Sequence, residues 1–437
     1  MEESSMFSHP AVYIVDGART PFLKARTAPN PLSSSDLAVA AGQALLMRQP
    51  FAPDEIDQVV VGSTIPNPNE TNIGRIVALR VGCGFSVPAM TVMRNCASGL
   101  QALDTAACQI MLGKSDLILA GGTDAMSQAP LLFNEDMTRW LAYFFATKTP
   151  LEKLKLIPQL RPHFFAPVIS MLKGLSDPVV GINMGQTAEN VAYEFGITRQ
   201  EMDEYSMQSQ LRTAKAQDDG VFNAEISSIC DPRGKSFASD DGVRRDTTLE
   251  KLAKLKPFFD KKYGQITAGN SSQITDGAAM LILASKEAVE RHRLPVLAKI
   301  VDCQWGALDP AFMGLGPAHA IAQLLAKQKL GIQDIDYWEI NEAFAAQVIG
   351  CVKALAQEKY CQEKLGLSGA LGAIDYERLN VSGGAIAIGH PVGASGARLI
   401  LHLAHLLRSK GVKRGVASLC IGGGQGGAML IESVDGV

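Results

Sequence analysis

The chain has 437 residues, 47% of them hydrophobic, so it is long enough for more than one domain and for large hydrophobic cores. Its 41 Lys and Arg residues nearly balance 44 Asp and Glu residues, and the net charge of −3 gives no general attraction to nucleic acid. The sequence contains no run of about 18 or more uncharged apolar residues, which argues against a transmembrane helix.

Strand and helix patterns alternate along the first third of the chain. Residues 11–15 and 56–61 are apolar runs typical of buried strands, and residues 36–47 and 73–81 have apolar residues at helical spacing. Residues 117–120 form a further predicted strand, closed by two glycines. Alternation of this kind predicts an α/β protein in which helices cover both faces of a sheet.

Residues 92–100 contain the first candidate for catalysis. An apolar run breaks abruptly into a helical pattern at Cys96, and the predicted helix continues to about residue 112. A thiol at a helix N-terminus is favoured as a thiolate, the nucleophilic form. The alternative is a structural cysteine, because free cysteine is among the most buried residue types.

The same pattern recurs near the C-terminus. Residues 54–61 resemble residues 333–340, and Cys96-Ala97-Ser98-Gly99-Leu100 resembles Gly393-Ala394-Ser395-Gly396-Ala397. The strand that ends at Gly121-Gly122 resembles residues 416–424. Three matches in the same order predict a duplicated α/β half.

A long insert, residues 123–262, separates the two similar halves. Its stretch 140–173 mixes aromatic and aliphatic residues with several lysines, which predicts an amphipathic helical hairpin. This hairpin is either a lid over the active site or a membrane-surface or partner-docking element. A capping box, Thr198 to Glu201, opens a predicted helix that extends to about residue 218.

Four segments could meet Cys96 in space. His390 precedes Pro391 in a turn, just before the segment that mirrors Cys96, so a pseudo-twofold between the halves would form a Cys–His couple. The plainer interpretation of His390 is a structural turn. Asn341 follows the predicted strand 337–340, at the sheet edge where α/β proteins bind ligands, although it could also be an N-cap.

The third segment, Cys420-Ile421-Gly422, ends another predicted strand, and the glycines there could offer backbone N–H groups to an oxyanion. A small polar loop, residues 267–272, could hydrogen-bond an extended ligand such as a pantetheine arm. Taken alone, each of these loops would be an ordinary turn.

The eight cysteines show neither a CxxC pair nor the Cys/His spacing of a structural zinc site. We therefore expect reduced thiols and no metal. The stretch Met1-Glu2-Glu3-Ser4-Ser5 is acidic and has neither a signal-peptide nor a transit-peptide pattern. From these features we expect a cytoplasmic, bacterial type of location.

Together these segments resemble one family, the thiolases, over essentially the whole chain. The resemblance is carried by Cys96, Asn341, His390 and Cys420 in that order, and by residues 16–22, 184–190, 252–258 and 379–391. It implies a duplicated thiolase fold, with two similar α/β halves of mixed five-stranded sheets layered with helices, and a large helical loop insert. The implied domains are 1–122 with 263–285, then a loop domain 123–262 with a hydrophobic insert at about 131–175 and a CoA-binding part, then 286–437.

Two departures from the commonest thiolase pattern refine the resemblance. The loop reads Ser272-Gln273-Ile274-Thr275-Asp276 where short-chain thiolases usually have Ser-Gly-x-Asn-Asp, and the insert is long and hydrophobic. Both features look like the β subunit of fatty-acid oxidation trifunctional complexes, including the bacterial long-chain 3-ketoacyl-CoA thiolase. That resemblance implies thiolysis of 3-ketoacyl-CoA in β-oxidation, a homodimeric core, a heterotetramer with a hydratase/dehydrogenase α subunit, peripheral membrane contact, and no nucleic-acid partner.

The resemblance also implies roles for individual residues. His390 takes the Cys96 proton, and the Cys96 thiolate becomes the acyl carrier. Cys420, with an unperturbed thiol pKa of about 8.5, protonates the acetyl-CoA enolate. Backbone N–H groups of Cys96 and Gly422 form one oxyanion hole, while His390 and a water held by Asn341 form the other.

Coenzyme A is implied as a co-substrate, with no other cofactor. Ser272 matches the family serine that bonds pantetheine, and Arg244 falls where an arginine meets the adenosine end. Further candidates for the CoA phosphates are Arg233, Lys235 and Arg245, although charged loop residues are more often simply solvated.

Three other functions remain open. A decarboxylating ketoacyl synthase shares the duplicated fold but uses two histidines, where this chain has Asn341 and Cys420. A biosynthetic acetoacetyl-CoA thiolase would use the same residues. A lipid-transfer or scaffold relative would have lost the activity, which the intact Cys96, Asn341, His390 and Cys420 disfavour.

Overall fold

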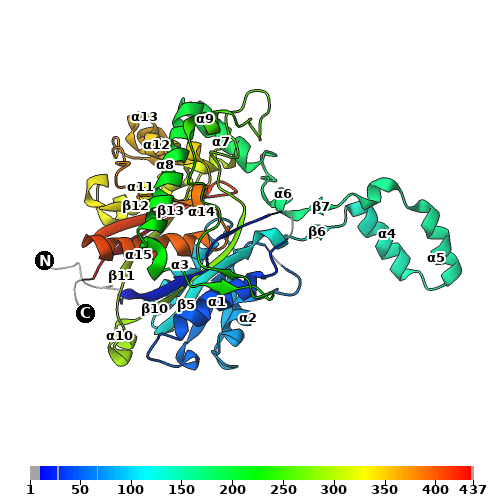
Figure 1. Ribbon diagram of the computed structural model, residues 1–437, viewed down its shortest axis with the longest axis horizontal. Coiled ribbons are helices and arrows are strands. Elements are labelled where there is room, and N and C mark those ends of the chain that lie inside the picture. Colours follow the sequence, from blue (N-terminus) through cyan, green and yellow to red (C-terminus); the bar gives the residue numbers. More distant parts are fainter. Residues whose placement is uncertain (1–9, 27–28, 66, 435–437) are drawn as a thin grey trace.

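The computed structural model describes residues 10–26, 29–65 and 67–434, so the stretch Met1 to Ser5 lies outside the described residues. One ten-stranded mixed sheet organises the chain, in the order β12-β13-β14-β11-β1-β10-β5-β3-β4, with β2 paired to β10. Helices cover the sheet, and a long arm projects from the body (Figure 1). The predicted α/β fold class is confirmed.

The N-terminal half contains the strands and helices of the first 125 residues and one strand that returns after the insert. These elements are β1 (Val12–Arg19), β2 (Leu23–Lys24), α1 (Ser34–Leu46), β3 (Gln58–Gly62), α2 (Ile73–Arg80), β4 (Ala89–Val92), α3 (Ser98–Met111), β5 (Leu117–Ala125) and β10 (Thr275–Ala284).

The insert is mainly helical, with two small hairpins. Its elements are β6 (Leu131–Leu132), α4 (Glu135–Ala146), α5 (Pro150–Leu156), β7 (Val168–Ile169), α6 (Ser170–Gly174), α7 (Met184–Glu194), α8 (Arg199–Asp218), β8 (Ile229–Cys230), β9 (Ser236–Phe237) and α9 (Leu249–Ala253).

The C-terminal half repeats the plan of the first. Its elements are α10 (Lys286–His292), β11 (Ala298–Ala307), α11 (Gly316–Gln328), β12 (Tyr337–Ile340), α12 (Ala345–Ala356), α13 (Glu358–Leu365), α14 (Ala385–Ile388), α15 (Ser395–Lys410), β13 (Arg414–Ile421) and β14 (Gln425–Glu432).

The strand pairing shows the duplication predicted from sequence. In the first half β3 is parallel to β5, β5 antiparallel to β10, and β10 antiparallel to β1. In the second half β12 is parallel to β13, β13 antiparallel to β14, and β14 antiparallel to β11. The two series have the same order and the same directions, so the halves share one topology.

The strand count differs from the prediction of five in each half. The C-terminal half contributes four strands, because its fifth position is filled by an extended segment with a single bridge, Trp338 to Leu379. The two halves also join edge to edge, since residues Val12 to Ile14 of β1 pair with Ile300 to Ala298 of β11. The result is one continuous sheet.

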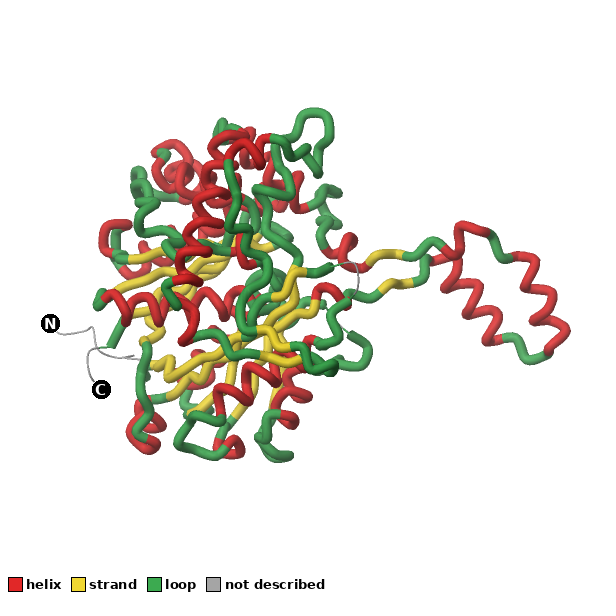
Figure 2. The backbone as a smooth tube through the Cα atoms, viewed as in Figure 1, coloured by secondary structure: helices red, strands yellow, loops and turns green. Residues whose placement is uncertain are grey.

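Alternation of side chains along the strands builds three cores. In β5, Ile118 and Ala120 face the central core, which also contains α3 and α15, whereas Leu119 faces a core with α1 and α2. In β13, Leu419 faces the central core and Cys420 faces a third core with α11 and α12. The two central helices are thus shared by both halves, between the two parts of the sheet (Figure 2).

The two central helices approach closely through glycine. A Cβ on Gly99 of α3 would lie 2.7 Å from the Gly393 carbonyl oxygen, and a Cβ on Gly396 of α15 would lie 2.4 Å from the Leu100 nitrogen. Neither position can hold a side chain without moving backbone. The contact brings together the segments that precede the two helices, which contain Cys96 and His390.

The helical hairpin of the insert does not cover the body. Strands β6 and β7 form a two-stranded stalk, and α4 and α5 extend beyond it, away from the sheet (Figure 1). We call residues 131–169 the arm. The prediction of a lid is therefore wrong for the two helices. Among the described residues, no helix combines the length and the apolar character needed to cross a membrane.

Candidate active site

A largely apolar cavity of about 650 Å³ opens at the junction of the halves and the base of the arm. Cys96 and Gly422 lie on its wall, together with Val392 from the turn that contains His390. Most other lining residues come from the loop after β3, the segment around β6, and α6 with the loop that follows it: Thr64, Ile65, Pro68, Met126, Pro130, Leu132, Met171, Leu175 and Val179.

Cys96 lies in a tight turn before α3, and not at the first residue of the helix as predicted. The helix begins at Ser98, with Ala97 as its cap. Burial raises the pKa of Cys96, and the charge of Asp124 adds to this, although backbone N–H groups of Gly422 and Cys96 itself act in the opposite direction. The expected thiolate is therefore not the resting form, because burial outweighs the donors.

Gly422 belongs to the turn between β13 and β14. Gly422 and Cys96 line the same cavity, and the Gly422 backbone N–H lowers the pKa of the Cys96 thiol. A donor that acts on this thiol also lies near any atom covalently bound to its sulfur. The two N–H groups of Cys96 and Gly422 can thus serve as the oxyanion hole that the sequence predicted.

His390 is buried and is oriented through both ring nitrogens. Nδ1 lies 2.5 Å from the Ser395 hydroxyl oxygen, and that hydroxyl lies 3.0 Å from the Pro391 carbonyl oxygen. A carbonyl can only accept, so the hydroxyl donates to Pro391 and accepts from Nδ1–H. This arrangement leaves Nε2 without a proton, so that it can accept one, as a general base requires.

The environment keeps His390 neutral. Burial, with a further contribution from the positive charge of Arg398, lowers the pKa of His390 to about 3. Both groups are therefore neutral at rest, Cys96 as a thiol and His390 as an imidazole. If the two form the predicted Cys–His couple, the proton has to move from Cys96 to Nε2 as the sulfur attacks.

Asn341 follows β12 directly, and its side-chain nitrogen lies 3.4 Å from Nε2 of His390. Helix α12 begins only at Ala345, with Phe344 as the cap, so the N-cap interpretation of Asn341 is wrong. The side-chain oxygen of Asn341 is buried without a hydrogen-bond partner. Such an acceptor suits a bound water, as the predicted second oxyanion hole requires.

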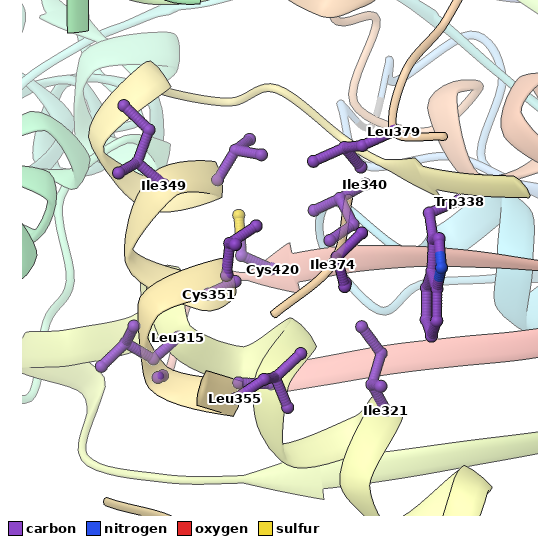
Figure 3. Packing of buried hydrophobic residues seen from close by; sticks show 14 of the residues in the cluster. Leu315, Ile321, Trp338, Ile340, Ile349, Cys351, Leu355, Ile374, Leu379 and Cys420 are labelled. Carbon is purple, nitrogen blue, oxygen red and sulfur yellow. The ribbon is translucent and has the colours of Figure 1, made fainter. Parts of the chain in front are cut away.

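Cys420 is fully buried near the end of β13 and packs in the third core, among side chains that include Cys351 and Ile374 (Figure 3). Burial raises the pKa of Cys420 well above its ordinary value, and the charges of Cys96 and Cys351 add to this. The assumption of an unperturbed thiol was therefore wrong. A thiol that keeps its proton at rest is still suited to donate it to a strong base such as an enolate.

Asp124 is a buried carboxylate at the end of β5 that the sequence did not single out. It accepts hydrogen bonds from Ser63, Thr64 and Ile65, which begin the loop along the cavity, and from the Gly393 N–H at 2.6 Å. One side chain thus ties the cavity wall to the turn of His390. Its position near the end of a predicted strand, just after Gly121-Gly122, is the sequence feature that could have marked Asp124 as a candidate site residue.

The predicted CoA-binding residues lie outside the cavity. Ser272 is half-buried and donates its backbone N–H to Ala343, and the backbone N–H of Arg244 donates to Gln210. The side chain of Gln273 connects the two segments, because it donates to the Gly242 carbonyl at 2.9 Å. The backbone carbonyl of Gln273 accepts from the backbone N–H of His390 at 3.0 Å.

The three further phosphate candidates differ in their surroundings. The Arg245 guanidinium already pairs with the Asp218 carboxylate at 2.8 Å. The Lys235 ammonium lies 4.8 Å from the centre of the Phe237 ring. Neither contact brings these residues to the cavity, and Arg233 is an exposed residue of the same loop as Lys235.

Residues 12–287 match the thiolase N-terminal domain, and residues 294–433 match the thiolase C-terminal domain. The chain belongs to the thiolase family. The predicted resemblance is confirmed.

Similar thiolases are bacterial and mammalian. A 3-ketoacyl-CoA thiolase of Serratia proteamaculans is 35% identical over 96% of each chain. The mitochondrial trifunctional enzyme subunit beta of Bos taurus is 36% identical over 97% of this chain and 88% of its own. The crystal structure of human mitochondrial 3-ketoacyl-CoA thiolase in complex with CoA has a TM-score of 0.83 and 36% identity, covering 97% of this chain and 98% of that one.

Proposed function

We propose that this thiolase is an acetyl-CoA acyltransferase that cleaves 3-ketoacyl-CoA with CoA, giving acetyl-CoA and a shortened acyl-CoA. The observation that carries the proposal is Cys96 on the wall of an apolar cavity that Gly422 also lines. Relatives named 3-ketoacyl-CoA thiolase along nearly the full length support it.

The first half-reaction needs a nucleophile, a base and a carbon acid. The Cys96 proton passes to Nε2 of His390, and the sulfur attacks the C3 ketone. The C2–C3 bond then breaks, which leaves an acyl group on Cys96 and an acetyl-CoA enolate. Cys420 gives its proton to the enolate carbon, while His390 and a water held by Asn341 stabilise the enolate oxygen.

The second half-reaction restores every group. The CoA thiol gives its proton to the Cys420 thiolate and attacks the acyl-thioester. Cys96 leaves and regains its proton from His390. Coenzyme A is thus a co-substrate, bound by Ser272 and Arg244 in this proposal, and no step needs a metal or a further cofactor.

The cavity favours a medium or long acyl chain over a biosynthetic acetoacetyl-CoA role. Its volume of about 650 Å³ falls within the roughly 300–1,000 Å³ of sites that enclose drug-sized ligands. Apolar side chains from Ile65, Leu132 and Met171 line it. An acetoacetyl group would leave most of this space empty, whereas an alkyl chain would fill it, consistent with fatty-acid β-oxidation.

The proposed assembly has a dimeric core. Strand β4 is the last strand in the sheet order, so within the described residues one of its edges has no partner. Phe85 and Met93, on either side of β4, are 91% and 58% exposed. An unpaired edge beside exposed apolar side chains suits pairing with a second copy.

The arm is proposed as the contact for a membrane surface and for a hydratase/dehydrogenase α subunit. Its exposed apolar side chains include Phe133, Tyr143, Phe145, Leu151 and Leu154. Apolar groups exposed in this number mark an interaction site. The similarity to a trifunctional enzyme subunit beta supports the subunit, and the proposed location is the cytoplasm.

A thiolysis assay tests the function. The purified protein is mixed with a 3-ketoacyl-CoA of medium chain length, with and without CoA, and acetyl-CoA is measured. We expect acetyl-CoA release that depends on CoA. No such release by the folded wild-type protein would refute the proposal, and decarboxylation without CoA would favour the synthase reaction.

Intact-mass measurement tests the nucleophile. Incubation of the wild-type protein with an acyl-CoA should add one acyl group, and the variant Cys96→Ala should gain none. An equal mass gain in Cys96→Ala would assign the acyl group to another residue.

A further inference from the structure

The side chain of Asn95 connects the two halves at the site. Asn95 precedes Cys96, and its side-chain Nδ2 donates to the Gly422 carbonyl at 2.8 Å. The two residues are 327 positions apart in the chain. Asn95, Cys96 and Gly422 line the same cavity, and the residue next to Cys96 is therefore bonded to the residue whose backbone N–H lowers the pKa of the Cys96 thiol.

The backbone at Asn95 aims the side chain. Its φ is 42°, in the left-handed region that asparagine tolerates better than most residues. The Ser98 hydroxyl fixes this turn, because it accepts from the Arg94 N–H and donates to the Asn95 carbonyl, both at 2.8 Å. The direction of the Asn95 amide thus follows from a rigid turn and not from a free rotamer.

The Gly422 turn needs such a restraint. Gly423 and Gly424 have φ of 90° and 75°, so the turn consists of residues with wide conformational freedom. Its far end is held by the Leu308 N–H, which donates to the Gly424 carbonyl at 2.8 Å. At the near end, a Cβ on Gly422 would meet only Met184 Sδ at 3.3 Å and Asn95 Nδ2 at 3.8 Å, so packing alone restrains it little.

We propose that Asn95 is a positioning residue that holds the Gly422 peptide so that its N–H faces the Cys96 sulfur and the oxyanion formed there. The inference deepens the proposed thiolysis and rests on it for the oxyanion. The effect on the sulfur itself does not depend on substrate. An oxyanion hole acts through donors that are fixed before the reaction. A Gly422 peptide that can rotate would therefore stabilise the Cys96 thiolate and the oxyanion less.

The main variant is Asn95→Gly, which keeps the left-handed backbone and removes the amide. We expect kcat for thiolysis to fall roughly 3- to 10-fold, the loss of one neutral hydrogen bond, with KM for CoA little changed. The pH midpoint for alkylation of Cys96 by iodoacetamide should rise by roughly half a unit to one unit, because the thiolate loses a fixed donor.

Two further variants complete the experiment. Asn95→Asp keeps the shape but turns an acceptor toward the Gly422 carbonyl, so its kcat should fall at least as far, and it serves if Asn95→Gly does not fold. Asn223→Gly, at an exposed position in the loop domain, controls for the general effect of replacing asparagine by glycine and should match the wild type.

The readouts separate this inference from the proposed function. A wild-type alkylation midpoint in the folded Asn95 variants would overturn the positioning role, whatever their kcat. A wild-type protein that releases no acetyl-CoA would count against thiolysis only, because alkylation requires no substrate.

Discussion

At the scale of single residues, the surroundings of the proposed catalytic groups favour their neutral forms. Burial raises the pKa of Cys96 and of Cys420, and it lowers the pKa of His390 to about 3. A cavity that accepts an alkyl chain has to be dry, and a dry site disfavours any isolated charge. In the proposed reaction, the Gly422 N–H, a water held by Asn341, and the Ser395 hydroxyl, which accepts from His390, stabilise charge only where the reaction creates it.

Ser395→Ala tests how His390 is oriented. Without the hydroxyl, Nδ1–H loses its acceptor, and the tautomer with a free Nε2 is no longer favoured. We expect kcat to fall about tenfold, equivalent to roughly one neutral hydrogen bond, with KM nearly unchanged. Steady-state thiolysis kinetics measure both. Ser409→Ala, at the exposed end of the same helix, is the control, and equal kcat in the two variants would reject the role of Ser395.

Cys420→Ala tests the proton donor. The variant keeps Cys96 and His390, so it should still be acylated by an acyl-CoA. Exchange of the acetyl-CoA α protons in D₂O, followed by NMR, should slow by roughly 10²- to 10⁴-fold, as for the loss of a general acid or base. Undiminished exchange would remove Cys420 from the mechanism.

At the scale of elements, α6 controls the cavity although it belongs to the insert. Met171 and Leu175 line the cavity wall, whereas Leu172, which lies between them in the sequence, is 55% exposed. One turn of helix thus offers a test position and a matched control. Because the arm ends just before α6, a deletion of the arm has to stop before α6 to leave the cavity wall intact.

Met171→Trp should shorten the acyl chain that the cavity accepts. A larger side chain fills space in the cavity, so kcat/KM for long-chain 3-ketoacyl-CoA should fall at least about tenfold, while acetoacetyl-CoA should be cleaved as before. Thiolysis rates over a series of chain lengths measure this. Leu172→Trp should leave the series unchanged, and loss of all chain lengths together in Met171→Trp would indicate disruption of the fold instead.

Removal of the arm tip separates docking from catalysis. Leu132 pairs with Val168, so residues 133–167 can be replaced by Asn-Gly, a two-residue turn that suits a hairpin. We expect binding to vesicles that contain anionic phospholipid to be lost, and thiolysis of dissolved substrate to be retained. Sedimentation with vesicles measures binding. Full vesicle binding by the shortened protein would exclude the arm as the membrane contact.

Sequence patterns predicted the elements that alternate regularly, and missed what depends on packing. The duplication, the strand before Asn341 and the helix opened by Thr198 follow from local periodicity and capping. The contact of Ser395 with His390 could not be inferred, because its match to Ser98 in the repeat does not say which side chain it contacts. Three further features could not be predicted from the sequence: the contacts of Asp124, the Asn95 contact with Gly422, and the outward direction of the arm. Each depends on how the tertiary fold places segments that are distant in the sequence.

At the scale of the whole molecule, a buried ionic cluster joins the loop domain to both halves. Arg19 of β1 pairs with Asp240 at 2.8 Å and with Glu225 at 3.1 Å, and Glu225 lies 2.6 Å from His402 of α15. Arg398 of the same helix pairs with Glu339 of β12 at 3.2 Å. With His402 protonated, three cations face three carboxylates, so the cluster is neutral.

The cluster makes stability depend on pH. Burial alone would lower the pKa of His402, but the Glu225 and Glu339 carboxylates outweigh it and raise that pKa above 6.5. Its stabilising contribution is therefore fully present below pH 6.5 and is lost as pH rises through the raised value. Burial would likewise raise the pKa of Glu225, but His402 and Arg19 hold it at about 2, against 4.5 ordinarily. That contribution is present above pH 4.5 and is lost as pH falls toward 2.

His402→Gln tests this linkage by thermal unfolding. At pH 6 the variant should be less stable, by roughly the 3–5 kcal/mol of a broken buried pair. Between pH 6 and pH 10 the wild-type midpoint should fall more than that of the variant, since the variant has no proton to lose. Parallel pH profiles for the two proteins would contradict the assignment of the alkaline loss to His402.

The meeting of α3 and α15 at Gly99 and Gly396 has a consequence for how this chain can change over time. Cys96, the proposed nucleophile, precedes one helix, and His390, the proposed base, precedes the other. The distance between the two helices is set at glycines, where a Cβ would meet the backbone of the other segment. A single methyl group at either position would have to be absorbed by both halves at once. The two copies of the duplicated unit can therefore drift apart on their outer faces, but along this seam each one restricts the mutations that the other can accept.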